Sequence, residues 1–130
     1  MKPASIVYRI VRLRNFMGAG SAVTLTVEEG WKEQKLRIIP PNESLQVMNH
    51  STGFEFGFAG SGPAQLALAI LFDFTESKST AVHLYQSFKF DHVARWTGAS
   101  ASIDGETISR WIDEMQRAAV SAELRQGGRL

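Results

Sequence analysis

The stretch from Phe54 to Leu71 constrains the fold more than any other part of the chain. It begins with alternating phenylalanines, continues through glycines at positions 57, 60 and 62, and then enters a long apolar segment at Pro63. Alternation predicts a short strand over Phe54–Phe58, and proline suits the first turn of a helix. The predicted helix, Pro63–Phe74, has Gln65 as its one polar residue before Asp73. A helix that is apolar all round must be buried, so this one belongs at the centre of the fold.

The residues before this stretch read as strands and those after it as helices. We expect strands at Ser5–Leu13, Val23–Val27 and Lys35–Ile39, and a short edge strand at Ser44–Met48. In the third of these, Leu36 and Ile38 are expected on the inner side. Asn15–Ser21 is expected to be a loop or an insertion. After the central helix we expect a helix capped by Ser79 or Thr80 and reaching about Trp96, a brief strand or extended loop at Ala99–Ile103, and a long final helix capped by Asp104.

Strands followed by helices favour an α+β fold: a small antiparallel sheet with three helices packed on one face, the central helix being fully buried. The length of 130 residues fits one domain. We place this domain at residues 1–125 and expect residues 126–130 to form a flexible tail.

Composition excludes several classes of function. The net charge of +1 gives no case for binding a nucleic-acid polymer, and the absence of cysteine removes thiolate metal sites and cysteine nucleophiles. His83 and His92 are nine residues apart and cannot chelate as a helical pair, so we expect neither a metal nor a cofactor. With no apolar run long enough for a bilayer, a cytoplasmic protein without membrane contact is expected.

The glycine turn before the central helix is the candidate binding site. The N–H groups of Gly60, Ser61 and Gly62 could form an anion nest backed by the helix dipole. The alternative is a tight turn in which the glycines serve backbone geometry alone. Pro63 removes one N–H group, and no Gly-Lys-Ser/Thr sequence follows, so the turn differs from a P-loop.

Four further side chains are candidate ligand contacts. Gln65 either reads a ligand edge or bonds the neighbouring loop backbone, and His50 either contacts an anion or caps its own loop. Tyr85 and Lys89 are one helical turn apart and either flank a ligand or form a half-buried face whose lysine reaches water. No catalytic triad or paired-carboxylate motif accompanies them, so no catalytic residue is assigned.

The segment Gly53–Phe58, followed by Gly60–Leu71, resembles the signature of a family of short proteins from phages, plasmids and prokaryotes known only as a domain of unknown function. The likeness includes Asn49–Ser51, extends to Leu84–Phe90 and more weakly to Ile103–Ile112, and so covers roughly residues 45–112. It implies a prokaryotic or viral origin and a shared fold. It implies no catalytic residues, because the family has no established activity.

Three hypotheses follow for the function. The first is a non-enzymatic protein that holds a nucleotide-like or other anionic small molecule at the glycine turn, as a phage or plasmid sponge against host defence signals. The second is a protein–protein interaction module of a mobile element with no small ligand. The third, less favoured, is an enzyme that uses His50 or Ser61. A homodimer through an antiparallel pair of final helices is also expected, because the stripe of Ile108, Trp111, Ile112, Met115, Ala119 and Ala122, with Ala118 beside it, exceeds what one small domain needs.

Overall fold

The computed structural model describes residues 1–14, 21–30 and 35–127. Its elements in chain order are β1 (Val7–Arg14), β2 (Ser21–Glu29), β3 (Lys35–Ile39), α1 (Asn42–Val47), α2 (Ser61–Thr75), α3 (Lys78–Asp91), the 3-10 turn η1 (Val93–Arg95), β4 (Ser100–Asp104) and α4 (Gly105–Gly127). The strands form one antiparallel sheet in the order β3-β2-β1-β4. The predicted α+β class with an antiparallel sheet is therefore confirmed. The expected loop at Asn15–Ser21 lies outside the described residues, apart from Ser21 at the start of β2.

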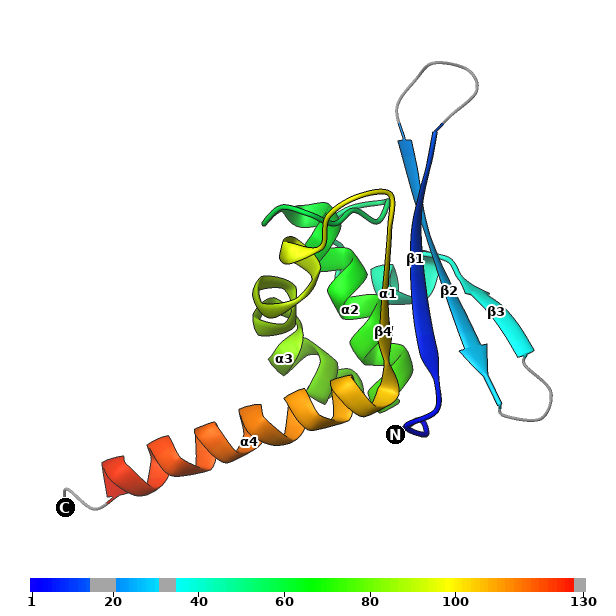
Figure 1. Cartoon of the computed structure of the whole chain (residues 1–130). Coiled ribbons are helices and arrows are strands. Elements are labelled where there is room, and N and C mark those ends of the chain that lie inside the picture. Colours follow the sequence, from blue (N-terminus) through cyan, green and yellow to red (C-terminus); the bar gives the residue numbers. More distant parts are fainter. Residues whose placement is uncertain (15–20, 31–34, 128–130) are drawn as a thin grey trace.

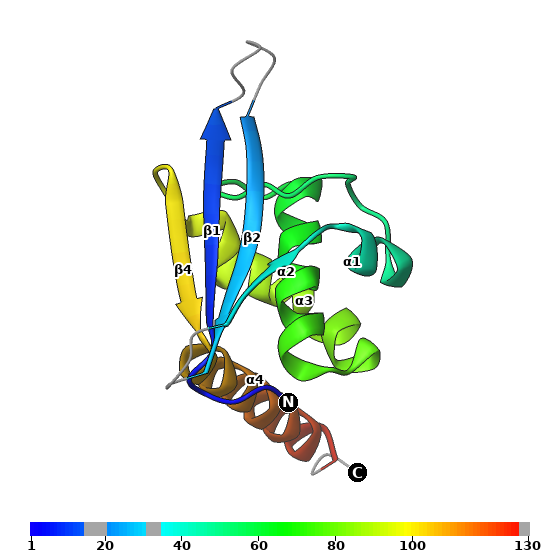
Figure 2. The same ribbon diagram turned by 90° about the vertical axis from the view of Figure 1, so that its right-hand side faces the viewer.

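Helices α1, α2 and α3 lie on the same side of the sheet, whereas α4 starts at the end of β4 and runs away from it (Figures 1 and 2). The described part of the chain holds four α-helices where the sequence predicted three. From Gly62 to Leu71 every residue of α2 is buried, while Ser61, Phe72 and Asp73 retain some exposure. The core of the domain forms where α2 meets the inner face of the sheet and the buried side of α3.

The additional helix is α1, where a short edge strand was predicted over Ser44–Met48. Pro41 precedes it with φ −61°, a value already suited to a helix start, and the Ser44 hydroxyl donates to the Pro41 carbonyl at 2.8 Å. Ser44 is buried and also accepts a hydrogen bond from Gln65 of α2. The strand prediction was wrong because this contact with α2 outweighs the weak strand pattern of the segment.

The face of β3 was also predicted wrongly. Leu36 and Ile38, expected inside, are each 72% exposed. They pair in register with Glu28 and Thr26, and partners across an antiparallel ladder share one face of the sheet. Arg37 consequently lies on the helix side, where its guanidinium reaches Asp73 of α2. A polar tether, rather than apolar burial, therefore selects the inner face of β3.

Two other predicted boundaries differ from the structure. The strand expected at Phe54–Phe58 is reduced to one bridge between Phe54 and Val23, because Gly57 turns the chain with φ +92°. Helix α3 is capped by Ser77, whose hydroxyl accepts from the Thr80 amide, rather than by Ser79 or Thr80. The final helix begins as predicted at Asp104, whose carboxylate accepts from the amide of Thr107 at 2.8 Å.

Helix α4 is divided into a packed half and an exposed half. Ile108, Trp111 and Ile112 are buried and Met115 packs against the core. Every residue from Gln116 to Gln126 is exposed, and Figure 1 shows this half projecting from the body. The helix continues through Gly127, two residues into the segment that was expected to be a tail. In the described ranges, no helix combines the length and apolar character needed to cross a membrane.

Candidate functional site

The start of α2 is an open helix end. Its N-cap, Gly60, has extended backbone with φ −137° and ψ −170°, and no side chain of the described residues caps the first turn. The amides of Ser61 and Gly62 belong to that first turn, in which amides have no partner within the helix. Any residue can adopt an extended backbone, so the φ value at position 60 does not require a glycine.

Gly62 serves close packing. A Cβ added at this position would lie 2.7 Å from the Cβ of Glu55, so a larger residue would displace Glu55 from the helix start. The carboxylate of Glu55 pairs with the guanidinium of Arg12 at 3.2 Å, and Arg12 also donates to the Phe56 carbonyl at 2.9 Å. The guanidinium carbon lies 4.1 Å from the centre of the Phe56 ring. The glycine turn is thereby fastened to β1, with one of the protein's own carboxylates beside it.

Gln65 is fully buried and bonds the preceding loop. Its amide oxygen accepts from the backbone N–H groups of His50 at 2.8 Å and Ser51 at 3.2 Å. Its amide nitrogen donates to the Ser44 hydroxyl at 2.8 Å and the Met48 carbonyl at 3.2 Å. These four contacts use the hydrogen-bonding capacity of a glutamine amide. These contacts match the second interpretation of Gln65, in which its amide bonds the backbone of the neighbouring loop.

His50 and Tyr85 meet beside this loop. The Nε2 atom of His50 and the hydroxyl of Tyr85 are 2.6 Å apart, and the two ring centres are 5.3 Å apart. The Tyr85 hydroxyl also donates to the sulfur of Met48 at 3.2 Å and accepts from Gln86. Three of the seven predicted contact residues are thus joined through the loop at residues 48–51: His50, Gln65 and Tyr85.

Lys89 lies one turn beyond Tyr85 on α3. Its side chain is 8% exposed, and its ammonium lies 4.3 Å from the centre of the ring of Phe90, an exposed residue. Lys89 is therefore almost entirely covered, and its ammonium lies against an aromatic ring. Because α2 and α3 form an antiparallel hairpin, the end of α3 returns to the end of the molecule where α2 begins (Figure 1).

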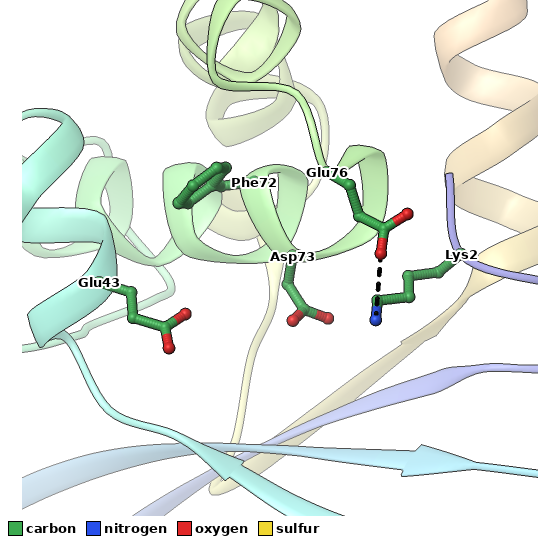
Figure 3. A pocket seen from close by; sticks show the side chains of 5 residues that line it. All are labelled: Lys2, Glu43, Phe72, Asp73 and Glu76. Atoms are coloured by element: carbon green, nitrogen blue, oxygen red, sulfur yellow. Dashed lines mark ion pairs between the residues drawn. The ribbon is translucent and has the colours of Figure 1, made fainter.

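A hollow of about 300 Å³ lies at the other end of α2, away from the predicted site. Lys2, Glu43, Phe72, Asp73 and Glu76 line it (Figure 3). Two of its three carboxylates are already paired: Glu76 with Lys2 at 3.3 Å, and Asp73 with Arg37 at 2.8 Å. Burial and the hydrogen bond to Asp73 raise the pKa of Tyr8, which keeps its phenol protonated. The hydrogen bond to Asp73 likewise raises the pKa of Arg37, so the tether between sheet and helix stays charged. The hollow is lined by internal ion pairs.

In the described ranges, His, Asp and Glu residues do not form a group of three or more that could hold a metal ion. A half-buried histidine, His92, lies near Phe88 and Trp111, with ring centres 5.0 and 6.1 Å away. Burial lowers its pKa. Its surroundings are aromatic rather than those of a ligand set.

The exposed half of α4 is the other candidate surface. Val120 is 54% exposed and Leu124 is 72% exposed, one turn apart on the same side of the helix. Gln116, Arg117, Val120 and Ser121 line a shallow groove of about 390 Å³ on that side. Sequence analysis identified the alanines of this half but missed Val120 and Leu124. The sequence does contain a signal for this surface, because Val120 and Leu124 are apolar residues four positions apart on an otherwise polar helix face.

Comparison with known proteins matches residues 19–114 to a family of unknown function, DUF6166. The chain belongs to this family. The matched region contains α1, α2 and α3 complete, whereas the exposed half of α4 lies beyond it. All of β1 also lies outside the match although it is a central strand, so the limits of the match are not the limits of the fold. No curated protein and no solved structure matches the chain.

Proposed function

We propose that the protein is a non-enzymatic interaction module whose contact surface is the exposed half of α4, residues 116–126. The observation that carries this proposal is the projection of about three helical turns away from the body, with Val120 and Leu124 uncovered. This was the second hypothesis from the sequence, and the geometry supports it better than the first.

The physical argument concerns what stabilises such a segment. Helices of fewer than about 12–15 residues are marginal in water, and most helical stability in proteins comes from packing an apolar face. The packed half of α4 nucleates the helix, but beyond Met115 nothing in the described structure covers it. A partner helix or groove would remove Val120 and Leu124 from water, and each buried apolar side chain contributes about 1.5–3 kcal/mol.

Binding of an anionic small molecule at the start of α2 is a second candidate. It is favoured by the uncapped first turn with Ser61 exposed, and by the positive charge of Lys89 on the neighbouring helix. Glu55 weighs against it, because this acidic residue packs beside Gly62 at the helix start, with its Cβ 2.7 Å from where a Cβ at position 62 would lie. The four hydrogen bonds of Gln65 to protein partners also weigh against a role for its amide in ligand contact.

The biological setting follows from the resemblance alone. We infer an origin in a phage, plasmid or prokaryotic genome and action in the host cytoplasm. A sponge for defence signals goes with the small-molecule candidate, whereas an interaction module would act on a host or replication protein, or on a second copy of the chain.

The proposal is tested by gel filtration of extracts from cells that carry the gene. The protein should elute at a mass above the 14.4 kDa of one chain, and the double variant Val120→Asp/Leu124→Asp should return to that mass without losing its fold. Elution of the wild type as a single chain at every concentration contradicts the proposal. In parallel, a rise in melting temperature with inorganic phosphate or nucleotides would favour the second candidate, because ligands of the folded state stabilise it.

A further inference from the structure

We propose that the partner of the exposed half of α4 is a second copy of this chain, paired antiparallel about a two-fold axis through Val120. The inference rests on the proposed function and names its partner. It goes further than the antiparallel dimer expected from the sequence, because it fixes the register of the pair.

The sequence around Val120 is self-complementary. Three residues before it stands Arg117 and three residues after it stands Glu123. In an antiparallel pair with Val120 opposite Val120, the residue three positions before the axis faces the one three positions after it. Arg117 of each copy therefore faces Glu123 of the other, which gives two ion pairs by symmetry. A parallel pair would place Arg117 against Arg117 and Glu123 against Glu123, which is repulsive.

Small residues allow the two helices to approach closely. The positions one and two residues from Val120 on either side are Ala118, Ala119, Ser121 and Ala122. Each is exposed in the single chain. Packed helices lie about 8–10 Å apart, and small side chains at the contact give the lower end of this range.

The groove on α4 provides a place for Leu124. In the same register Leu124 of one copy faces Gln116 of the other, at the edge of the groove lined by Gln116, Arg117, Val120 and Ser121. Leu124 is the most exposed large apolar side chain of α4. Each copy thus supplies the side chain that fills the other copy's groove, as a two-fold interface requires.

The projection of α4 makes room for this pair. Gln116 lines a hollow with residues of α3, and beyond it the second half projects from the body, so a second helix can run beside it (Figure 1). A contact along about three helical turns buries less surface than the roughly 1,200–2,000 Å² of a stable protein interface. We therefore expect a weak dimer that dissociates in the micromolar range and weakens with salt.

Sedimentation equilibrium of the purified full chain, from low micromolar to several hundred micromolar, measures this association. Arg117→Glu and Glu123→Arg each replace both ion pairs by like charges and should weaken the dimer about tenfold. The double variant Arg117→Glu/Glu123→Arg restores opposite charges in the antiparallel register and should recover the affinity. Arg95→Glu, an exposed charge on η1, is the matched control and should leave association unchanged.

Val120→Asp should abolish the dimer, with circular dichroism confirming that each variant keeps its fold. A single-chain mass at all concentrations overturns this inference, as does a dimer that tolerates Val120→Asp or is not rescued by the double swap. A single-chain mass for the pure protein, combined with a larger mass in native extracts, would leave the interaction module standing with a different partner. A single-chain mass in both would remove the two proposals together.

Discussion

Arg37 of β3 donates two hydrogen bonds to Asp73 of α2, at 2.8 and 3.1 Å. Tyr8 of β1 donates a third to the same carboxylate, at 2.7 Å. One side chain of the central helix thus holds an edge strand and a central strand of the sheet. This tether turns Leu36 and Ile38 towards solvent.

Removal of this carboxylate should destabilise the fold. In Asp73→Ala, the buried phenol of Tyr8 loses its hydrogen-bond partner, and Arg37 keeps Glu29 but loses its link to the helix. An unpaired buried polar group costs about 1–3 kcal/mol. We expect the free energy of unfolding to fall by about 2–4 kcal/mol in urea titrations. Glu43→Ala, in the same hollow, is the control and should change it by less than about 0.5 kcal/mol. Equal effects of the two variants would show that the tether contributes little.

The amide of Gln65 should matter for stability before it matters for any ligand. Gln65→Ala leaves the backbone amides of His50 and Ser51 without their acceptor, while the Ser44 hydroxyl loses the bond from Gln65 and keeps its bond to Pro41. We expect a loss of about 2–4 kcal/mol in the free energy of unfolding. Gln86→Ala removes an exposed amide from α3 and serves as the control. A Gln65→Ala protein as stable as the wild type would argue against the structural role and return Gln65 to the ligand contacts.

His92 should make stability depend on pH. Because burial lowers its pKa in the folded protein, the unfolded chain binds a proton more readily. Its contribution to stability is complete above the unfolded pKa of about 6.5 and is lost as pH falls through the lower folded value. The urea concentration at the unfolding midpoint of the wild type should therefore decrease as the pH is lowered from about 7.5 to about 5.5. His92→Phe should make this decrease smaller. His83→Phe, at an exposed position, should not. The same slope in both variants would exclude His92 as its source.

The central features of the fold could be predicted from the sequence because they depend on local pattern. The buried helix α2 follows from its apolar residues and from Pro63 near its start, and α4 from its cap at Asp104 and its stripe up to Met115. The inner face of β3 could not be predicted, since it is set by Arg37 finding a carboxylate 36 residues away in the chain. The same holds for α1, whose Ser44 is fixed by Gln65.

The candidate sites were predicted less well, for a related reason. Three of the predicted contact residues do come together: Gln65, His50 and Tyr85. Gln65 bonds the backbone of the loop that contains His50, and the His50 ring bonds Tyr85, contacts that sequence spacing alone does not reveal. The alanine stripe of α4 was recognised as excess. What spacing could not show is where the body ends along the helix, and therefore that Val120 and Leu124 are uncovered.

Site-specific photocrosslinking in cells that carry the gene tests the central claim most directly. A benzophenone amino acid replaces Val120 in one variant and Thr97, an exposed residue before β4, in the control. If the exposed half of α4 is the contact surface, the probe at position 120 should form a discrete crosslinked product that the probe at position 97 does not. A product of twice the chain mass identifies a second copy, and another mass identifies a different protein. The absence of any product specific to position 120, with both variants folded and expressed, would contradict the account.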